Sequence, residues 1–212
     1  EGTILAAKEI HWAGNGILYG GGALVLNDTR LLDPNVDQDV TDQSTRVLTI
    51  ASGTTLRCSG VVFKQNIENS GVIEADVAQS KVTGAREKVL WFNGTINNRG
   101  TIRVSNGGHI NVNRPAIWNR TGVITSGPGG GSVRVEMPFH MFGSIDALAG
   151  SRGLPPPTGG IIRVDGGDLE IGIDAMNLGR FQRGPGGGVV KLGTVTMRGV
   201  TVDAGAEVDL GP

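Results

Sequence analysis

The sequence predicts an all-β protein that forms a single β-solenoid, in which the chain coils and each repeat makes about one turn. A five-residue phrase, Gly-x-Ile-x-Ala or a near relative, returns along the chain, with its central apolar residues 21 to 29 positions apart. That apolar residue alternates with small or polar neighbours, which indicates a strand and not a helix. Glycine makes up 36 of 212 residues and punctuates runs of Val, Ile and Thr, unlike a collagen triplet or a disordered tract.

The first part of the chain, residues 1–46, breaks the register of the later repeats. Within it, residues 20–26 resemble a strand, whereas the acidic stretch that follows resembles a loop. We expect residues 1–46 to form an irregular N-terminal cap, or else to pair with the edge of a neighbouring molecule, and residues 47–212 to form the solenoid. An open sheet edge is an aggregation hazard, so both ends should be covered by a cap or by another subunit.

The repeated strands begin near residue 50, and their central residues should form apolar columns in the core. These residues are Ile50, Ile73, Ile102, Ile124, Ile145, Ile173 and Val202. The phrases Asn69-Ser70-Gly71 and Asn98-Arg99-Gly100, and a longer version at Asn119, precede three of them. Asn and Gly both tolerate the left-handed backbone region, so Asn-x-Gly predicts a tight corner between two strands.

A second strand recurs late in the chain, around Val133, Ile162 and Val190, at nearly equal spacings. Three loops rich in Gly and Pro account for part of the repeat length, at residues 127–130, 154–157 and 184–187. We expect these loops to project from one side of the solenoid.

The Asn-x-Gly-x-Ile corners, the phrases at 48–56 and 200–208 and the Gly-Gly-x-Val-Arg-Val strands resemble a known class of protein. They are similar to the right-handed parallel β-helix regions of large bacterial surface proteins, of the filamentous-haemagglutinin and autotransporter-passenger type. The resemblance covers about residues 47–210 and is one of repeat style. It implies a right-handed, three-sided β-helix of about seven turns, an extracellular or cell-surface location and a structural or adhesive role. It transfers no catalytic residue.

Charge and composition exclude several function classes. The net charge is −1, so the chain has no basic field for nucleic acid, and its apolar runs are far shorter than a membrane span. Cys58 is the single cysteine, so no internal disulfide can form, and a buried inert thiol is expected. No nucleophile elbow, phosphate loop, dinucleotide fingerprint or zinc motif is present. We therefore expect no enzymatic activity and no cofactor, with calcium as the one ion to consider.

An acidic segment with clustered carboxylates is the reason to consider calcium. Hard cations take six to eight oxygen ligands, and a loop of this kind could provide several of them. The candidate ligands are Asp33, Asp37, Asp39 and Asp42. The spacing does not match an EF-hand, and a solvated loop is the simpler interpretation of the segment.

A second acidic group is the series Asp146, Asp174 and Asp203, which follows the central residues of three repeats. Stacked about 4.8 Å apart, these carboxylates would repel one another unless they bound cations or a ligand, or paired with bases. Two interpretations stay open: a glycan-binding or glycan-cleaving face, and a ladder compensated by Arg134, Arg163 and Lys191 on the preceding strand.

Aromatic residues and sequons offer further candidates. Phe63, Trp91 and Trp118 are almost evenly spaced along the chain and could stack, either as a platform for sugar rings or as core. Three Asn-x-Thr sequons, at Asn27, Asn93 and Asn119, could carry glycans, although such triplets also arise by chance in a chain of this composition.

The sequence thus predicts an extracellular structural or adhesive solenoid that stacks end to end with other copies, as in a fibre or surface layer. The alternative is a β-helix that binds or cleaves polysaccharides, such as a lyase or a phage tailspike section. Possible partners are further copies of the chain and surface glycans.

Overall fold

The computed structural model places 26 strands and no helix in the part of the chain that it describes. The described residues are 3–6, 9–11, 15–27, 30–32, 47–59, 61–63, 66–76, 89–92, 96–112, 117–119, 121–135, 140–141, 161–172, 175–177, 180–192, 196–198 and 200–210. Every strand pairing among them is parallel, so the prediction of an all-β chain is confirmed. Since these residues contain no helix, they contain none that is long and apolar enough to cross a membrane.

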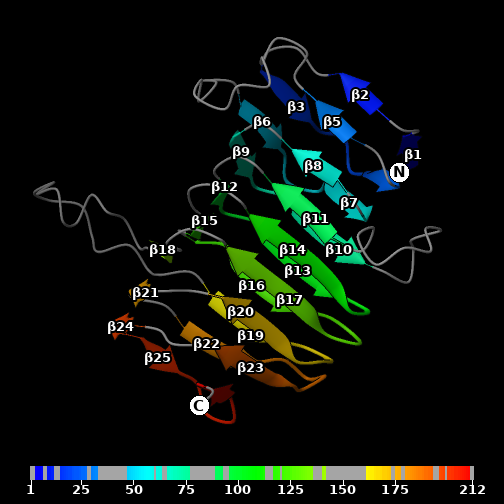
Figure 1. Cartoon of the computed structure of the whole chain (residues 1–212). Coiled ribbons are helices and arrows are strands. Elements are labelled where there is room, and N and C mark those ends of the chain that lie inside the picture. Colours follow the sequence, from blue (N-terminus) through cyan, green and yellow to red (C-terminus); the bar gives the residue numbers. More distant parts are fainter. Residues whose placement is uncertain are drawn as a thin grey trace, which may run out of the picture.

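The strands form two large sheets and two smaller ones (Figure 1). Sheet A contains β1 (Thr3–Ala6), β4 (Ala23–Asn27), β7 (Thr55–Ser59), β10 (Val72–Asp76), β13 (Thr101–Ser105), β16 (Val123–Ser126), β19 (Ile161–Val164), β22 (Arg180–Arg183) and β25 (Thr201–Val202). Sheet B contains β2 (Glu9–His11), β5 (Arg30–Leu32), β8 (Val61–Phe63), β11 (Val89–Phe92), β14 (Gly108–Val112), β17 (Gly131–Val135), β20 (Leu169–Gly172), β23 (Val189–Leu192) and β26 (Glu207–Asp209). Sheet C contains β3 (Gly16–Leu18), β6 (Val47–Ile50), β9 (Asn66–Asn69), β12 (Ile96–Asn98) and β15 (Ile117–Asn119). Sheet D contains β18 (His140–Met141), β21 (Ala175–Asn177) and β24 (Thr196–Arg198).

The chain visits the sheets in rotation. Each strand of sheet A is followed by one of sheet B and then by one of sheet C or, from β18 onward, sheet D. Within each sheet a strand therefore pairs with the strand three places later in the sequence, but in the described part of the chain β15 does not pair with β18, because sheet C ends at β15 and sheet D begins at β18. The colours in Figure 1 run in order from blue to red down the stack. We call one passage of the chain through three sheets a coil. Neighbouring strands in a sheet belong to consecutive coils, so most contacts join residues that are one coil apart in the sequence.

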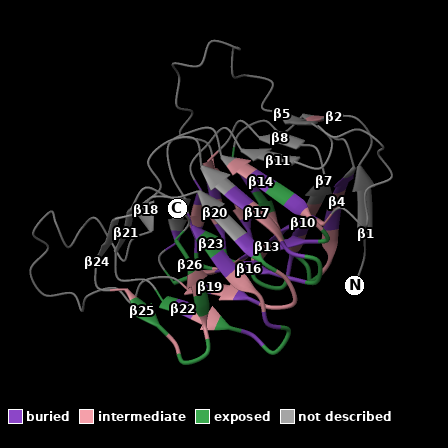
Figure 2. Ribbon diagram, turned by 60° about the horizontal axis from the view of Figure 1, so that its bottom comes forward, coloured by how far each residue is buried: buried purple, intermediate pink, exposed green. Residues whose placement is uncertain are grey.

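Buried residues, purple in Figure 2, recur on successive strands, and the apolar ones among them align in columns. One column of sheet A runs through Leu24, Leu56, Ile73, Ile102, Ile124, Ile162 and Phe181. All seven side chains are buried. The predicted alignment of Ile73, Ile102 and Ile124 is confirmed, and burying each such side chain contributes on the order of 1.5–3 kcal/mol.

Two members of the predicted core series differ from the expectation, and two others lie outside the described residues. Ile50 is buried, but it lies on β6 of sheet C and pairs in register with Asn69, not with Ile73. Val202 has the expected place in sheet A, opposite Phe181, yet it is 53% exposed because β25 is the last strand of that sheet. Ile145 and Ile173 lie outside the described residues.

The Asn-x-Gly corners form as predicted, but for a different physical reason. Gly71, Gly100 and Gly122 do not have positive φ angles. Glycine is required there because a Cβ would overlap the neighbouring coil: at Gly71 the carbonyl of Thr54, at Gly100 the carbonyl of Gly71. The preceding asparagines are likewise not in left-handed conformations, since Asn106 is the one non-glycine residue with positive φ among the described residues.

Those asparagines instead point inward and form a hydrogen-bonded ladder. Asn69 Nδ2 donates to Asn98 Oδ1, and Asn98 Nδ2 donates to Asn119 Oδ1, both at 2.7 Å. Asn69 is 1% exposed and the other two are fully buried. Buried amides need partners, and identical side chains one strand apart provide them for one another.

The described Gly-Pro loops are stacked turns and not projections. The turn at 127–130 joins β16 to β17, and the turn at 184–187 joins β22 to β23. Backbone bonds link each such turn to the next coil: Asn106 donates to Pro128, Gly129 to Gly166, and Gly166 to Gly187. The expectation that these two loops project is therefore wrong, and the loop at 154–157 lies outside the described residues.

The N-terminal segment is regular where the structure describes it. Strands β1 to β5 lie within residues 3–32, and those of sheets A and B pair in register with the later strands, with Leu24 opposite Leu56. The expected break of register is thus wrong there, because these strands carry the apolar alternation without the Gly-x-Ile-x-Ala phrase. Among the described residues sheets A and B each contain nine strands, more than the seven expected turns.

The copies of the second repeated motif lie in two different sheets. Val133 and Val190 lie in sheet B, whereas Ile162 lies in sheet A. Val133 pairs with Ile171, and Val190 pairs with Leu169. Strands of both sheets need the same alternation of apolar and polar residues, so similar phrases do not imply the same sheet.

A polar hollow on sheet B

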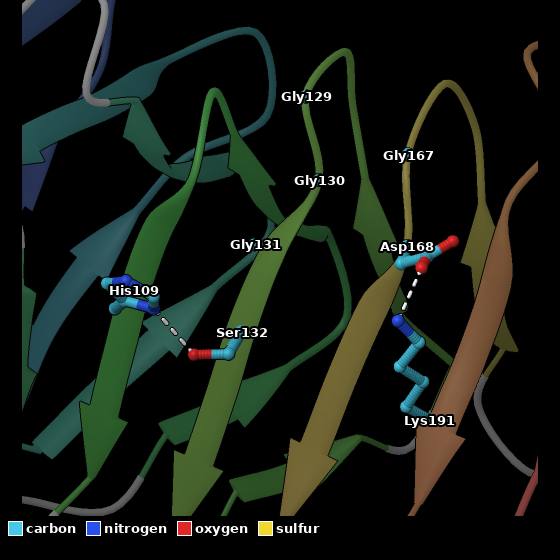
Figure 3. Close-up of a pocket in the computed structure, with 8 residues that line it drawn as sticks. All are labelled: His109, Gly129, Gly130, Gly131, Ser132, Gly167, Asp168 and Lys191. Atoms are coloured by element: carbon cyan, nitrogen blue, oxygen red, sulfur yellow. Dashed lines mark hydrogen bonds and ion pairs between the residues drawn. The ribbon is translucent and has the colours of Figure 1, made fainter.

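A shallow hollow of about 360 Å³ lies on sheet B and the turns that enter it (Figure 3). It is lined by His109, Ser132, Asp168, Lys191 and the glycines 129–131 and 167. His109 and Ser132 are register partners on β14 and β17, and Lys191 lies on β23. These positions alternate with the buried Ile110, Val133 and Val190, so their side chains leave the opposite face of the sheet.

One side of the hollow holds a histidine–serine pair. His109 Nδ1 and Ser132 Oγ are 2.7 Å apart, within hydrogen-bond distance. His109 is exposed, and Ser132 is half-buried. The pair presents an imidazole and a hydroxyl to solvent, both able to donate or accept hydrogen bonds.

The other side holds an ion pair. Lys191 Nζ lies 2.6 Å from Asp168 Oδ2, and the backbone N–H of Val189 donates to Asp168 Oδ1 at 3.0 Å. The hydrogen bond from Lys191, then that from Val189, lowers the pKa of Asp168 below its usual value of 3.8. Both side chains are about half exposed, so solvent screens this pair.

Three of the four glycines that line the hollow have paired backbone amides. The N–H groups of Gly129, Gly130 and Gly131 donate to the carbonyls of Gly166, Gly127 and Asp168. A serine nucleophile needs unpaired donors aimed at the developing oxyanion, and these three amides cannot serve. The side chains that line the hollow can hydrogen-bond a polar ligand.

Most of the predicted site residues lie elsewhere or outside the described residues. Asp33, Asp37, Asp39, Asp42, Asp146, Asp174 and Asn93 lie outside them. Asp203 follows β25, where its Oδ1 accepts a hydrogen bond from Arg180 Nε at 2.6 Å. The three bases of the predicted compensating ladder do not share one column, because Arg163 lies in sheet A while Arg134 and Lys191 lie in sheet B. The ladder itself stays a prediction, since Asp146 and Asp174 lie outside the described residues.

The three aromatic residues of the expected stack do not share one register column. Trp91 lies on β11 of sheet B, opposite Val62 and Asn111, and Trp118 lies on β15 of sheet C, opposite Asn97. Phe63 pairs with Phe92, one residue beyond Trp91. Equal spacing in sequence did not imply one column, because the lengths of the coils differ.

Of the predicted glycan acceptors, Asn119 is fully buried and Asn98 donates to its side chain, so in the folded chain a glycan cannot reach it. Asn27 is the last residue of β4. Among the described residues no group of three or more His, Cys, Asp or Glu could hold a metal ion. The calcium hypothesis concerns the acidic segment outside these residues and stays a prediction.

Sequence reasoning missed the hollow. His109 and Ser132 are one coil apart in the sequence, and so are Asp168 and Lys191. The proximity of these residues cannot be read from the sequence until the strand register is known. Register decides which polar residues on successive coils become neighbours.

The chain matches no protein-family model, no curated protein and no solved structure.

Proposed function

We propose that the chain is a right-handed parallel β-helix that serves as an extracellular structural or adhesive element and associates end to end. Support for the β-helix is the strict rotation among the sheets together with exclusively parallel pairing among the described strands. Support for the handedness is that crossover connections between parallel strands are right-handed in about 98% of cases. The extracellular location rests on the resemblance of the repeats to bacterial surface proteins.

The observation that carries the association is the exposure of apolar residues at β25 and β26. These are the last strands of sheets A and B, so within the described part of the chain one side of each is without a strand partner. Val202 occupies the core column next to Phe181 but is 53% exposed, and Leu210 just beyond β26 is 49% exposed. An unpaired edge with exposed apolar residues is a template for another strand, and a second copy offers its own edge at β1 and β2.

Replacing Val202 by Asp tests this proposal. A charge in the exposed core column should prevent another coil from stacking there, without disturbing residues that are already covered. Sedimentation velocity and negative-stain electron microscopy across a concentration series should show association of the parent chain and its loss in Val202→Asp. The matched control is Val123→Asp, which adds the same charge to the outward side of β16, well away from the edge.

A parent chain that stays monomeric at high concentration contradicts the proposal. Loss of association in both variants would indicate a lateral contact through the face of sheet A and would also contradict stacking through the edge.

A second candidate function, glycan binding, is favoured by the hollow on sheet B. Its imidazole, hydroxyl, carboxylate and ammonium groups are typical of a site that hydrogen-bonds sugar hydroxyls. A glycan array should then give hits that disappear in His109→Ala and Lys191→Met and persist in Val123→Asp. Equal binding by all variants would exclude the hollow as the site.

A further inference from the structure

The outward face of sheet A carries a row of five polar residues in register, four of them charged. The row is Arg57 on β7, Glu74 on β10, Arg103 on β13, Thr125 on β16 and Arg163 on β19. Each position alternates with a buried column residue such as Ile102 or Ile124, so all five leave the same face of the sheet. The row is one acid against three arginines, a local excess of positive charge on a chain of net charge −1.

In the first half of the row, from Arg57 to Arg103, the charges are paired. Glu74 lies between two arginines, and its Oε2 and Oε1 accept from Arg57 Nε and Arg103 Nε, each at 2.7 Å. The carboxylate thereby bridges strands that are two spacings apart, about 9–10 Å. Its side chain is 4% exposed although it faces outward, so the carboxylate is enclosed, while the two arginines reach solvent.

The second half repeats this geometry without the acid. Arg103 and Arg163 are again separated by one strand, and the residue between them is Thr125. The Thr125 hydroxyl donates to the carbonyl of Ser126 and brings no charge. Arg163 Nε is shielded from solvent and has no hydrogen-bond partner among the described residues. A buried donor of this kind is rare and costs free energy until an acceptor reaches it.

We propose that the face of sheet A over Thr125 is a binding site for an oxyanion, a carboxylate or a sulfate, held between Arg103 and Arg163. The anion takes the place that the Glu74 carboxylate has between Arg57 and Arg103. The half-buried Arg163 side chain rotates outward to bring Nε to it. Guanidinium groups suit this role, because they donate several hydrogen bonds in a planar fork. The anion comes free from solution or as a group on an acidic polysaccharide.

The test is a titration of the ¹⁵N-labelled chain with sodium sulfate at constant ionic strength, followed through the arginine Nε–H signals in NMR spectra. The signals of Arg103 and Arg163 should shift and saturate, and that of Arg180 should not. Arg163→Met should lose the saturable shift, whereas Arg180→Met, which removes an arginine already paired with Asp203, should keep it.

A second variant tests the anion site without the removal of an arginine. Thr125→Glu supplies the missing acid from within, so it should weaken sulfate binding at least tenfold and raise the melting temperature. Thr125→Gln, of the same shape without the charge, should do neither. A parent chain without saturable shifts overturns the proposal, as does a Thr125→Glu variant that binds sulfate as tightly as the parent.

Heparin at equal sulfate concentration distinguishes the two sources of the anion. Binding at least tenfold tighter per sulfate identifies a polysaccharide chain as the ligand, and equal binding identifies the free anion. Either result supports the site, and neither depends on whether the chain associates end to end.

Discussion

The buried ladder of Asn69, Asn98 and Asn119 is the residue-scale feature with the most direct consequence for stability. Replacing Asn98 by Ala removes both ladder bonds and leaves the buried Oδ1 of Asn119 without its donor. Each buried polar group left unsatisfied costs about 1–3 kcal/mol. We expect Asn98→Ala to lower the free energy of unfolding by about 2–4 kcal/mol, measured by urea denaturation.

Asn97→Ala is the control for that change. Its side chain is half-buried and donates outward to Glu68 at 2.8 and 3.0 Å. Asn97→Ala should lower the free energy of unfolding by about 1 kcal/mol, because water can replace a hydrogen bond made at the surface. Equal losses in the two variants would mean that the ladder adds nothing beyond an ordinary hydrogen bond.

The ion pairs of Glu74 should contribute to the free energy of unfolding, although both of its arginine partners reach solvent. Arg57 and Arg103 are 29% and 41% exposed, so solvent reduces the value of each ion pair. Glu74→Gln should nevertheless lower the free energy of unfolding by about 1–3 kcal/mol, since an enclosed carboxylate between two guanidinium groups is replaced by an amide. Asp203→Asn, in a pair whose arginine is 54% exposed, should cost at most about 1 kcal/mol. Urea denaturation of the two variants measures both values, and equal costs would mean that enclosure of Glu74 adds nothing.

Asp168 makes the stability of the chain depend on acid pH. Its pKa is lowered by Lys191 and by the Val189 N–H, so the folded state favours the ionised carboxylate. The contribution is therefore present above the unfolded value of 3.8 and disappears as pH falls through the lower folded pKa. Melting curves of the parent and of Asp168→Asn should differ slightly at neutral pH and converge at the acid end. A difference that grows on acidification would contradict this assignment.

At the scale of the elements, close approach between coils decides where glycine is required. A Cβ on Gly100 would overlap the carbonyl of Gly71 in the preceding coil, and backbone atoms cannot move aside cheaply. Gly100→Ala should therefore lower the free energy of unfolding by about 2–4 kcal/mol. At Gly107 a Cβ meets nothing within 4 Å, and only the φ of +75° is unfavourable, so Gly107→Ala should cost about 1–2 kcal/mol. The reverse order, measured by thermal or urea unfolding, would show that backbone conformation outweighs packing.

The strands were predictable from the sequence and their partners only in part. Ile73, Ile102 and Ile124 align as expected because each follows an Asn-x-Gly corner that fixes its place in the coil. Val133 and Ile162 look equivalent yet lie in different sheets, because both sheets demand the same apolar alternation. In sheet A the step from Leu56 to Ile73 is less than half as long as the step from Ile124 to Ile162, so no single period could assign the partners.

The sites were less predictable than the fold for the same reason. The pairs His109–Ser132 and Glu74–Arg103 join residues on neighbouring coils, and their proximity depends on register to the single residue. The expected aspartate series was inferred from one repeated phrase, without knowledge of the sheet to which each copy belongs. Copies of a phrase can lie on different sheets, so the phrase alone does not bring their carboxylates together.

At the scale of the whole molecule, each coil contacts mainly the coils before and after it, so damage should remain local. Ile124 is fully buried between Ile102 and Ile162, and Ile124→Asp places a charge in the core. In a quasi-one-dimensional fold, stability is a sum of coil and interface terms, so strands distant from the change need not unfold with it.

Hydrogen exchange measured by mass spectrometry separates this behaviour from global unfolding. In Ile124→Asp the amides of β13, β16 and β19 should exchange fast, whereas those of β4, β7 and β10 stay protected, since their mutual pairings in sheet A are untouched. Val123→Asp, on the outward side of the same strand, should leave the pattern close to that of the parent. Uniform loss of protection across all strands of Ile124→Asp would show that the nine strands of sheet A unfold as one unit, and an unchanged melting temperature would refute the placement of Ile124 in the core.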